Sequence, residues 1–97
     1  SPVEGDGKEK QVTDRLKRLK FRAWHRGTRE ADYMIGGFFD RYAATWSEEE
    51  IAWYETVVEE DDVDIMAWAL GTGEPPAHLD RPDLIAAMRR LDYIPLP

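Results

Sequence analysis

Apolar residues recur along most of this chain at intervals of three and four, the spacing that places side chains on one face of an α-helix. Thr13 is a good N-cap residue, and Gly27 suits a helix end because glycine adopts a left-handed backbone at low cost. The pattern therefore predicts a first helix that starts near Thr13 and ends at Gly27. Its apolar stripe consists of Val12, Leu16, Leu19 and Ala23.

A second helix is expected after Thr28, which can cap it. Gly36 and Gly37 lie inside this helix, and each costs about 1 kcal/mol relative to alanine. The pair therefore indicates either the close approach of another helix or a local bend. The apolar face of the second helix carries Ala31, Met34, Ile35, Phe38, Phe39, Tyr42 and Trp46.

The third helix has the clearest predicted boundary. Ser47 and Glu50 have the spacing of a capping box, so the helix is expected to start at Glu48. Trp46 and Ile51 occupy the two positions of a hydrophobic staple, which supports the same start.

Two further helices complete the predicted fold. The fourth covers roughly residues 63–70 and stops at Gly71, and the fifth begins around Arg81 or Pro82. No alternating strand pattern is present, so the sequence predicts an all-α, compact five-helix bundle. The predicted core includes Leu16, Leu19, Ile35, Phe38, Phe39, Val58, Trp68, Leu84 and Leu91.

The 97 residues fit a single domain. Residues 1–11 are polar and contain two glycines and a proline, so they are expected to form a mobile tail. The helical domain is predicted to span residues 12–93. Residues 94–97 are expected to be a C-terminal tail, because Pro95 and Pro97 cannot continue a helix.

The net charge of −7 is unevenly distributed along the chain. Residues 8–29 contain nine Lys or Arg and two acids, whereas residues 48–64 contain nine acids and no base. Folding must bring both segments into one small body, which produces either a polarised binding surface or two solvated helix faces. Helical geometry places Phe21 on the outer side of the first helix with Arg18, Arg22 and His25. Phe21 is therefore either a contact residue or packed under a neighbouring helix.

Several kinds of chemistry lack the residues that they need. There is no cysteine, and His25 and His78 do not stand in a metal-binding spacing. The segment 71–73 lacks the third glycine of a dinucleotide-binding motif, so the chain itself is not expected to hold FAD or NAD. Neither a membrane span nor an export signal is predicted, and the chain is expected to be soluble. We expect no enzymatic activity and no metal.

The predicted corner between the first two helices is a candidate docking surface. Gly27 removes a side chain where another backbone could approach, Arg26 offers planar donors, and Glu30 stands in the first turn of the second helix. The alternative is an ordinary helix junction with solvated charges.

The corner reads Arg26-Gly27-Thr28-Arg29-Glu30 and resembles the R-G-x-x-E signature of the SdhE family, the succinate dehydrogenase assembly factors. The resemblance covers about residues 16–76. It continues through Asp32, the Gly36-Gly37-Phe38-Phe39 segment, the acidic start of the third helix and the Trp68-containing fourth helix. His25 departs from the family pattern, in which a second arginine is common at this place.

The resemblance implies a partner, the flavoprotein subunit of succinate dehydrogenase and also that of the related fumarate reductase. The chain would promote covalent attachment of FAD to the partner's own histidine, with the FAD belonging to the partner. It would act as a monomer when free, in the bacterial cytoplasm or the mitochondrial matrix. The partner-binding residues implied are Arg26, Gly27, Glu30, Arg18, Phe21, Arg22 and Asp32.

Two other functions remain open from the residues alone. An antitoxin-like or regulatory protein could bind another protein or nucleic acid through the basic first helix, although a pI near 4.7 opposes general affinity for nucleic acid, and none is expected. A small enzyme could use surface carboxylates, for which the abundance of Asp and Glu is the sole support.

Overall fold

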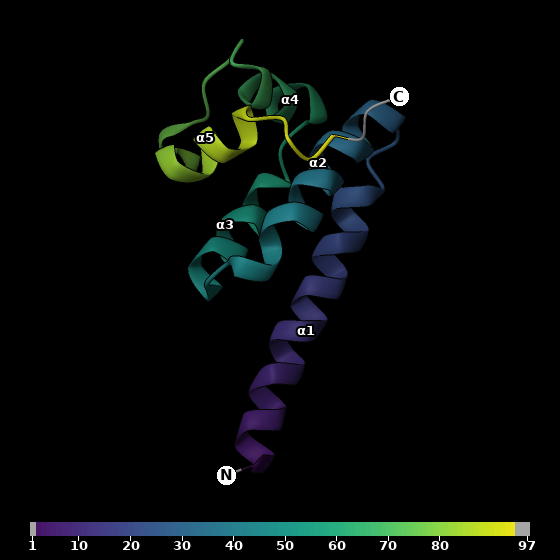
Figure 1. The fold of residues 1–97 in the computed structure, drawn as a ribbon, viewed down its shortest axis with the longest axis vertical. Helices are drawn as coiled ribbons and strands as arrows, with labels where there is room; N and C mark the ends of the chain where they lie inside the picture. Colours follow the sequence, from purple (N-terminus) through teal and green to yellow (C-terminus); the bar gives the residue numbers. More distant parts are fainter. Residues whose placement is uncertain (1, 95–97) are drawn as a thin grey trace.

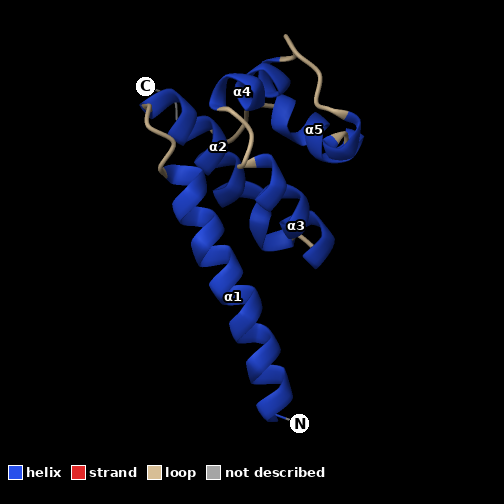
Figure 2. Ribbon diagram, turned by 180° about the vertical axis from the view of Figure 1, so that it is seen from behind, coloured by secondary structure: helices blue, strands red, loops and turns tan. Residues whose placement is uncertain are grey.

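The computed structural model describes the backbone of residues 2–94 and the side chains of residues 11–94. This part of the chain is helical and contains no strand, which confirms the predicted five-helix bundle (Figures 1 and 2). None of the described helices is both long and apolar enough to cross a membrane. The helices are α1 (Pro2–Trp24), α2 (Arg29–Tyr42), α3 (Glu48–Val57), α4 (Asp62–Leu70) and α5 (Pro82–Arg89), with short 3-10 helices at Ala43–Thr45 and Ala77–Leu79.

Helix α1 begins at Pro2, so the predicted start near Thr13 is wrong. Pro2 stands at the first helical position, where a backbone N–H would have no hydrogen-bond partner within the helix, so proline is tolerated. The two glycines that follow weaken the helix without ending it. The N-terminal half of α1 projects from the body of the bundle (Figure 1). At the other end, Ile94 packs against the core, and the rest of the predicted C-terminal tail lies outside the described residues.

Helix α2 occupies the centre of the bundle and packs against α1 and α4. Its Phe38 is fully buried within a group of aromatic rings, and the ring centroids lie 5.1 to 6.5 Å from that of Phe38. These separations suit offset and edge-to-face aromatic contacts, which add to the free energy of burial. The surrounding rings are those of Tyr42, Trp46, Trp53, Tyr54 and Tyr93.

The predicted core is largely confirmed, with two corrections. Leu16 is half-buried because α1 leaves the body of the bundle toward its N-terminus. Leu91 is also half-buried and lies beyond the end of α5, in a left-handed conformation with φ of 54°. The buried members of the predicted set are Leu19, Ile35, Phe38, Phe39, Val58, Trp68 and Leu84.

Close packing accounts for the glycine pair in α2. A Cβ atom at position 36 would lie 2.7 Å from Cγ of Trp24, and one at position 37 would lie 2.8 Å from the carbonyl oxygen of Tyr93. Both separations are shorter than a carbon atom tolerates. Of the two interpretations of Gly36 and Gly37, close approach is therefore correct.

The predicted caps of the middle helices are present. Glu50 N–H donates to Oγ of Ser47 at 3.3 Å, and Ser47 N–H donates to the Glu50 carboxylate at 2.9 Å. This reciprocal pair confirms the capping box and the start of α3 at Glu48. Gly71 ends α4 with φ of 79°, as expected for a C-terminal glycine.

Candidate partner-binding site at the helix corner

The turn between α1 and α2 depends on Gly27. Its φ of 109° lies in a region that residues with a Cβ rarely adopt. A Cβ placed at this position would have no described heavy atom within 4 Å, so the space beside the backbone is open. The predicted left-handed glycine is confirmed, and it leaves a bare stretch of backbone at the surface.

The side chains of Thr28, the N-cap residue of α2, and of Asp32 in its first turn fix the geometry of this turn. Thr28 Oγ1 accepts a hydrogen bond from Ala31 N–H at 3.2 Å, which confirms the predicted N-cap. Asp32 Oδ1 accepts one from the backbone N–H of Arg26 at 2.6 Å. The Asp32 carboxylate also lies in the first turn of α2, where the helix dipole favours a negative charge. Asp32 therefore holds the end of α1 against the start of α2.

Arg26 makes a network of internal contacts that we call the Arg26 clamp. Its Nε donates to Oδ1 of Asp62 at 2.7 Å, and its two terminal nitrogens donate to the carbonyl oxygens of Val58 at 2.7 Å and Glu60 at 3.0 Å. The side chain is 11% exposed. Arg26 is predicted from the sequence to offer its donors to a partner, but each guanidinium nitrogen already bonds within the chain. Its observed role is to join the corner to the turn between α3 and α4.

Glu30 is arranged differently from Arg26. It is exposed in the first turn of α2, as expected, and its carboxylate makes no hydrogen bond or ion pair with another described residue. A carboxylate at this position stabilises the helix through the helix dipole, but its contribution to the free energy of folding is small at an exposed site. Glu30 is therefore available for contact with another molecule.

The outer face of α1 presents Phe21 to solvent. Phe21 is 63% exposed, so the alternative in which a neighbouring helix covers it is wrong. Its ring stacks on that of His25 with centroids 4.0 Å apart, and His25 Nδ1 lies 2.7 Å from the Phe21 carbonyl oxygen. Arg18 and Arg22 are exposed on the same face. The structure thus brings these four predicted residues onto one continuous strip that leads to the corner.

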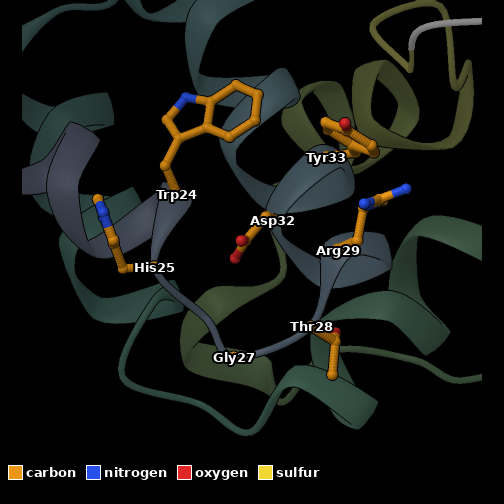
Figure 3. Close-up of a pocket in the computed structure, with 7 residues that line it drawn as sticks. All are labelled: Trp24, His25, Gly27, Thr28, Arg29, Asp32 and Tyr33. Carbon is orange, nitrogen blue, oxygen red and sulfur yellow. The ribbon is translucent and has the colours of Figure 1, made fainter.

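Two open hollows flank the corner. The first has a volume of about 540 Å³, and Figure 3 shows the Asp32 carboxylate pointing into the space enclosed by the loop from His25 to Thr28. Its lining residues are Trp24, His25, Gly27, Thr28, Arg29, Asp32 and Tyr33. The second, of about 580 Å³, lies between the end of α1 and the turn of residues 58–62.

The lining residues include several that the sequence analysis did not predict as part of the site. Trp24 and Tyr33 flank the R-G-x-x-E segment, and their position beside it in the sequence could have indicated them. The acidic turn of residues 58–62 is far away in sequence and is brought to the corner by the Arg26 clamp. Local sequence patterns contain no signal for that approach.

The basic and acidic segments of the sequence meet along one side of the bundle. Arg15 donates two hydrogen bonds to the Glu55 carboxylate, at 2.8 and 3.3 Å, and this contact raises the pKa of Arg15. The Arg26 clamp forms the second bridge between the segments. Part of the charge asymmetry is thus satisfied internally, while Arg18 and Arg22 remain directed to solvent. Within the described residues, no group of three or more His, Cys, Asp or Glu side chains is placed to hold a metal ion.

Comparison with known proteins identifies relatives that match about two thirds of the chain. The chain is 43% identical over 63 residues to the FAD assembly factor SdhE of Acetobacter pasteurianus, a match that covers 65% of this chain and 58% of that protein. It is 31% identical over 61 residues to a mitochondrial succinate dehydrogenase assembly factor 2 from Schizosaccharomyces japonicus, covering 63% of this chain and 43% of the relative. The corresponding protein of Debaryomyces hansenii is 32% identical over 68 residues, covering 70% and 46%.

The chain therefore spans about half the length of these curated relatives. No solved structure matches it. The model of the Sdh5 family, described as flavinator of succinate dehydrogenase, matches residues 17–92, a range that contains the corner, the Arg26 clamp and most of the core. With well over half of its residues matched, the chain belongs to this family, and the resemblance to the succinate dehydrogenase assembly factors is confirmed.

Proposed function

We propose that this protein is an assembly factor that binds the flavoprotein subunit of succinate dehydrogenase, and that of the related fumarate reductase, and promotes covalent attachment of FAD. The observation that carries the proposal is the family match over residues 17–92. The names of the relatives, FAD assembly factor and succinate dehydrogenase assembly factor, support the same function.

The geometry of the corner suits protein binding. Gly27 exposes backbone next to open space, and Glu30 presents a carboxylate without a partner among the described residues. Phe21 adds an apolar surface beside Arg18 and Arg22, and aromatic and arginine side chains are common in the centres of protein interfaces. The corner can therefore supply polar, apolar and charged contacts to one partner.

In this proposal the chain acts without a catalytic centre of its own. The FAD and the histidine that receives it belong to the flavoprotein, and this chain holds that protein in the state in which the bond forms. Glu30, Gly27, Phe21, Arg18 and Arg22 contact the partner. Arg26 and Asp32 do not contact the partner in this proposal. They hold the corner in shape through hydrogen bonds within the chain.

The test is covalent flavinylation in cells that lack the native factor. The flavoprotein subunit is co-expressed with wild-type protein or with Glu30→Ala, and covalent flavin is measured by in-gel fluorescence. We expect Glu30→Ala to lower flavinylation at least tenfold while changing the free energy of unfolding by less than about 1 kcal/mol. The matched control is Glu49→Ala, which removes an exposed glutamate from the first turn of α3 and should leave flavinylation unchanged.

Normal flavinylation with a folded Glu30→Ala protein would remove Glu30 from the binding site. Flavinylation that is equal with and without the wild-type chain would contradict the function itself. No feature of the described structure favours a nucleic-acid-binding or enzymatic function over this one.

A further inference from the structure

Helix α4 is apolar on two opposite faces. One face buries Ile65, Trp68 and Ala69 against the bundle. Helical geometry places Val63, Met66 and Leu70 on the other side, at intervals of three and four residues. Val63 is 78% exposed and Leu70 is 54% exposed, while Met66 is half-buried. We call these three residues the α4 stripe.

A helix that carries apolar side chains on two faces normally has cover on both of them. Large apolar side chains in the described part of the chain are otherwise buried or half-buried, except for Phe21 and Tyr33. Phe21 lies on the strip of α1 that leads to the α1–α2 corner, and Tyr33 lines the first hollow. The exposed apolar surface is therefore concentrated at the corner and along α4.

The Arg26 clamp makes these two regions neighbours. Asp62, which receives the Nε hydrogen bond of Arg26, immediately precedes Val63 in the chain. The α4 stripe thus starts beside the corner and extends along the helix by about 10 Å, given a rise of about 1.5 Å per residue. A partner that covers the corner would need to extend only this distance to cover the stripe.

Charge identifies the kind of surface that would fit. Asp64 borders the stripe on one side, and Glu59, Glu60 and Asp61 precede it. Asp62, on the other side, is already paired with Arg26. Pairing of α4 with α4 of a second copy would place these carboxylates against each other, which disfavours a dimer through this face. The complementary surface is apolar with lysine or arginine at its border.

We propose that the α4 stripe is a second, apolar contact for the same flavoprotein subunit that binds the corner, an inference that rests on the function proposed above. The exposed apolar side chains near the corner are Phe21 and Tyr33, and interfaces derive much of their affinity from a few apolar anchors in a desolvated centre. The stripe supplies such anchors. It receives an apolar patch of the flavoprotein that is bordered by basic side chains.

The experiment measures the dissociation constant between the purified flavoprotein subunit and four variants of the full chain. Val63→Ser combined with Leu70→Ser removes the exposed part of the stripe and leaves Met66 and the core in place. We expect affinity to fall at least tenfold and the thermal melt to stay within a few degrees of wild type. Asp64→Lys should also weaken binding by reversing the charge at the border. Ala86→Ser, an exposed position on α5, is the matched control and should bind as wild type does. Glu30→Ala reports on the corner.

The outcomes separate the two proposals. If Glu30→Ala weakens binding and the Val63 and Leu70 double variant does not, the α4 stripe is no contact and the proposed function stands. Absence of binding by the wild-type chain overturns both. Should the double variant unfold, amide hydrogen exchange of the wild-type chain decides the matter: protection of residues 63–70 on addition of the flavoprotein supports the contact, and protection confined to residues 18–33 overturns it.

Discussion

Arg26 and Asp62 lie 36 positions apart in the sequence, yet Nε of one and Oδ1 of the other are 2.7 Å apart. The same guanidinium also donates hydrogen bonds to two carbonyl oxygens of the turn between α3 and α4. An arginine in the R-G-x-x-E segment therefore holds together three elements: the end of α1, the end of α3 and the start of α4.

Replacement of Arg26 by lysine should destabilise the protein by about 1 to 3 kcal/mol, because a single ammonium group cannot reproduce the planar set of donors. Urea unfolding monitored by circular dichroism measures the change. Arg18→Lys is the control, because Arg18 is exposed and should tolerate the exchange. Equal stabilities for the two variants would show that the Arg26 clamp contributes nothing in solution.

Alanine at position 36 or 37 should destabilise the protein, although alanine is the better helix former by about 1 kcal/mol. The added methyl group would overlap the indole of Trp24 at position 36 and the Tyr93 carbonyl at position 37. Overpacking of this kind costs typically about 1 to 3 kcal/mol. Thermal melts of Gly36→Ala and Gly37→Ala measure the net effect, and a raised melting temperature in both would contradict the close packing.

Phe38→Ala should be among the most damaging single substitutions in the chain. The side chain is fully buried and contacts rings from α2, α3 and the C-terminal segment, so its removal leaves a cavity that these large rings cannot readily fill. The expected loss is about 3 to 5 kcal/mol, as for other buried phenylalanines. Urea unfolding measures this loss. A decrease in the free energy of unfolding of less than about 1 kcal/mol would contradict the placement of Phe38.

Stability should decline at high pH because of two buried phenols. Burial raises the pKa of Tyr54 and of Tyr93, whose hydroxyl groups donate to the carbonyl oxygens of Ile35 and Met88. The unfolded chain releases these protons near pH 10, whereas the folded chain retains them. Above about pH 10 the unfolded state therefore binds fewer protons, and the free energy of unfolding falls as pH rises.

Urea unfolding between pH 8 and pH 11 tests this dependence. The fall should be shallower in Tyr54→Phe, which has one buried phenol fewer, and the comparison at pH 8 gives the contribution of the Tyr54 hydrogen bond separately. Parallel curves for Tyr54→Phe and wild type would show that the Tyr54 phenol does not contribute to the pH dependence.

Sequence patterns were sufficient where the controlling residues are local. Ser47 and Glu50 cap the helix that they precede, and Gly71 terminates α4, so both boundaries could be predicted from a few neighbouring positions. The start of α1 could not be predicted, because residues 2–11 extend a helix without the apolar period that marks one. Helix propensity is a weak signal when no face is buried.

The candidate site shows the same division. Gly27 and Glu30 were placed correctly because their environments follow from the helix end and the helix start beside them. The periodicity of α1 predicted that Phe21 faces outward. Whether another helix covers Phe21 depends on the packing of the whole bundle, and no described residue buries it. The contacts of Arg26 depend on how α3 and α4 meet, and no short-range pattern encodes that meeting.

The Arg26 clamp also determines what kind of epitope the corner can be. Because the clamp draws on residues 26, 58, 60 and 62, the surface is discontinuous and exists only when the whole bundle has formed. A synthetic peptide of residues 18–32 would contain the R-G-x-x-E sequence without the support that orients it, and it should neither bind the flavoprotein nor compete with the intact chain. Under the proposed function, recognition of the partner would therefore require this chain to be folded.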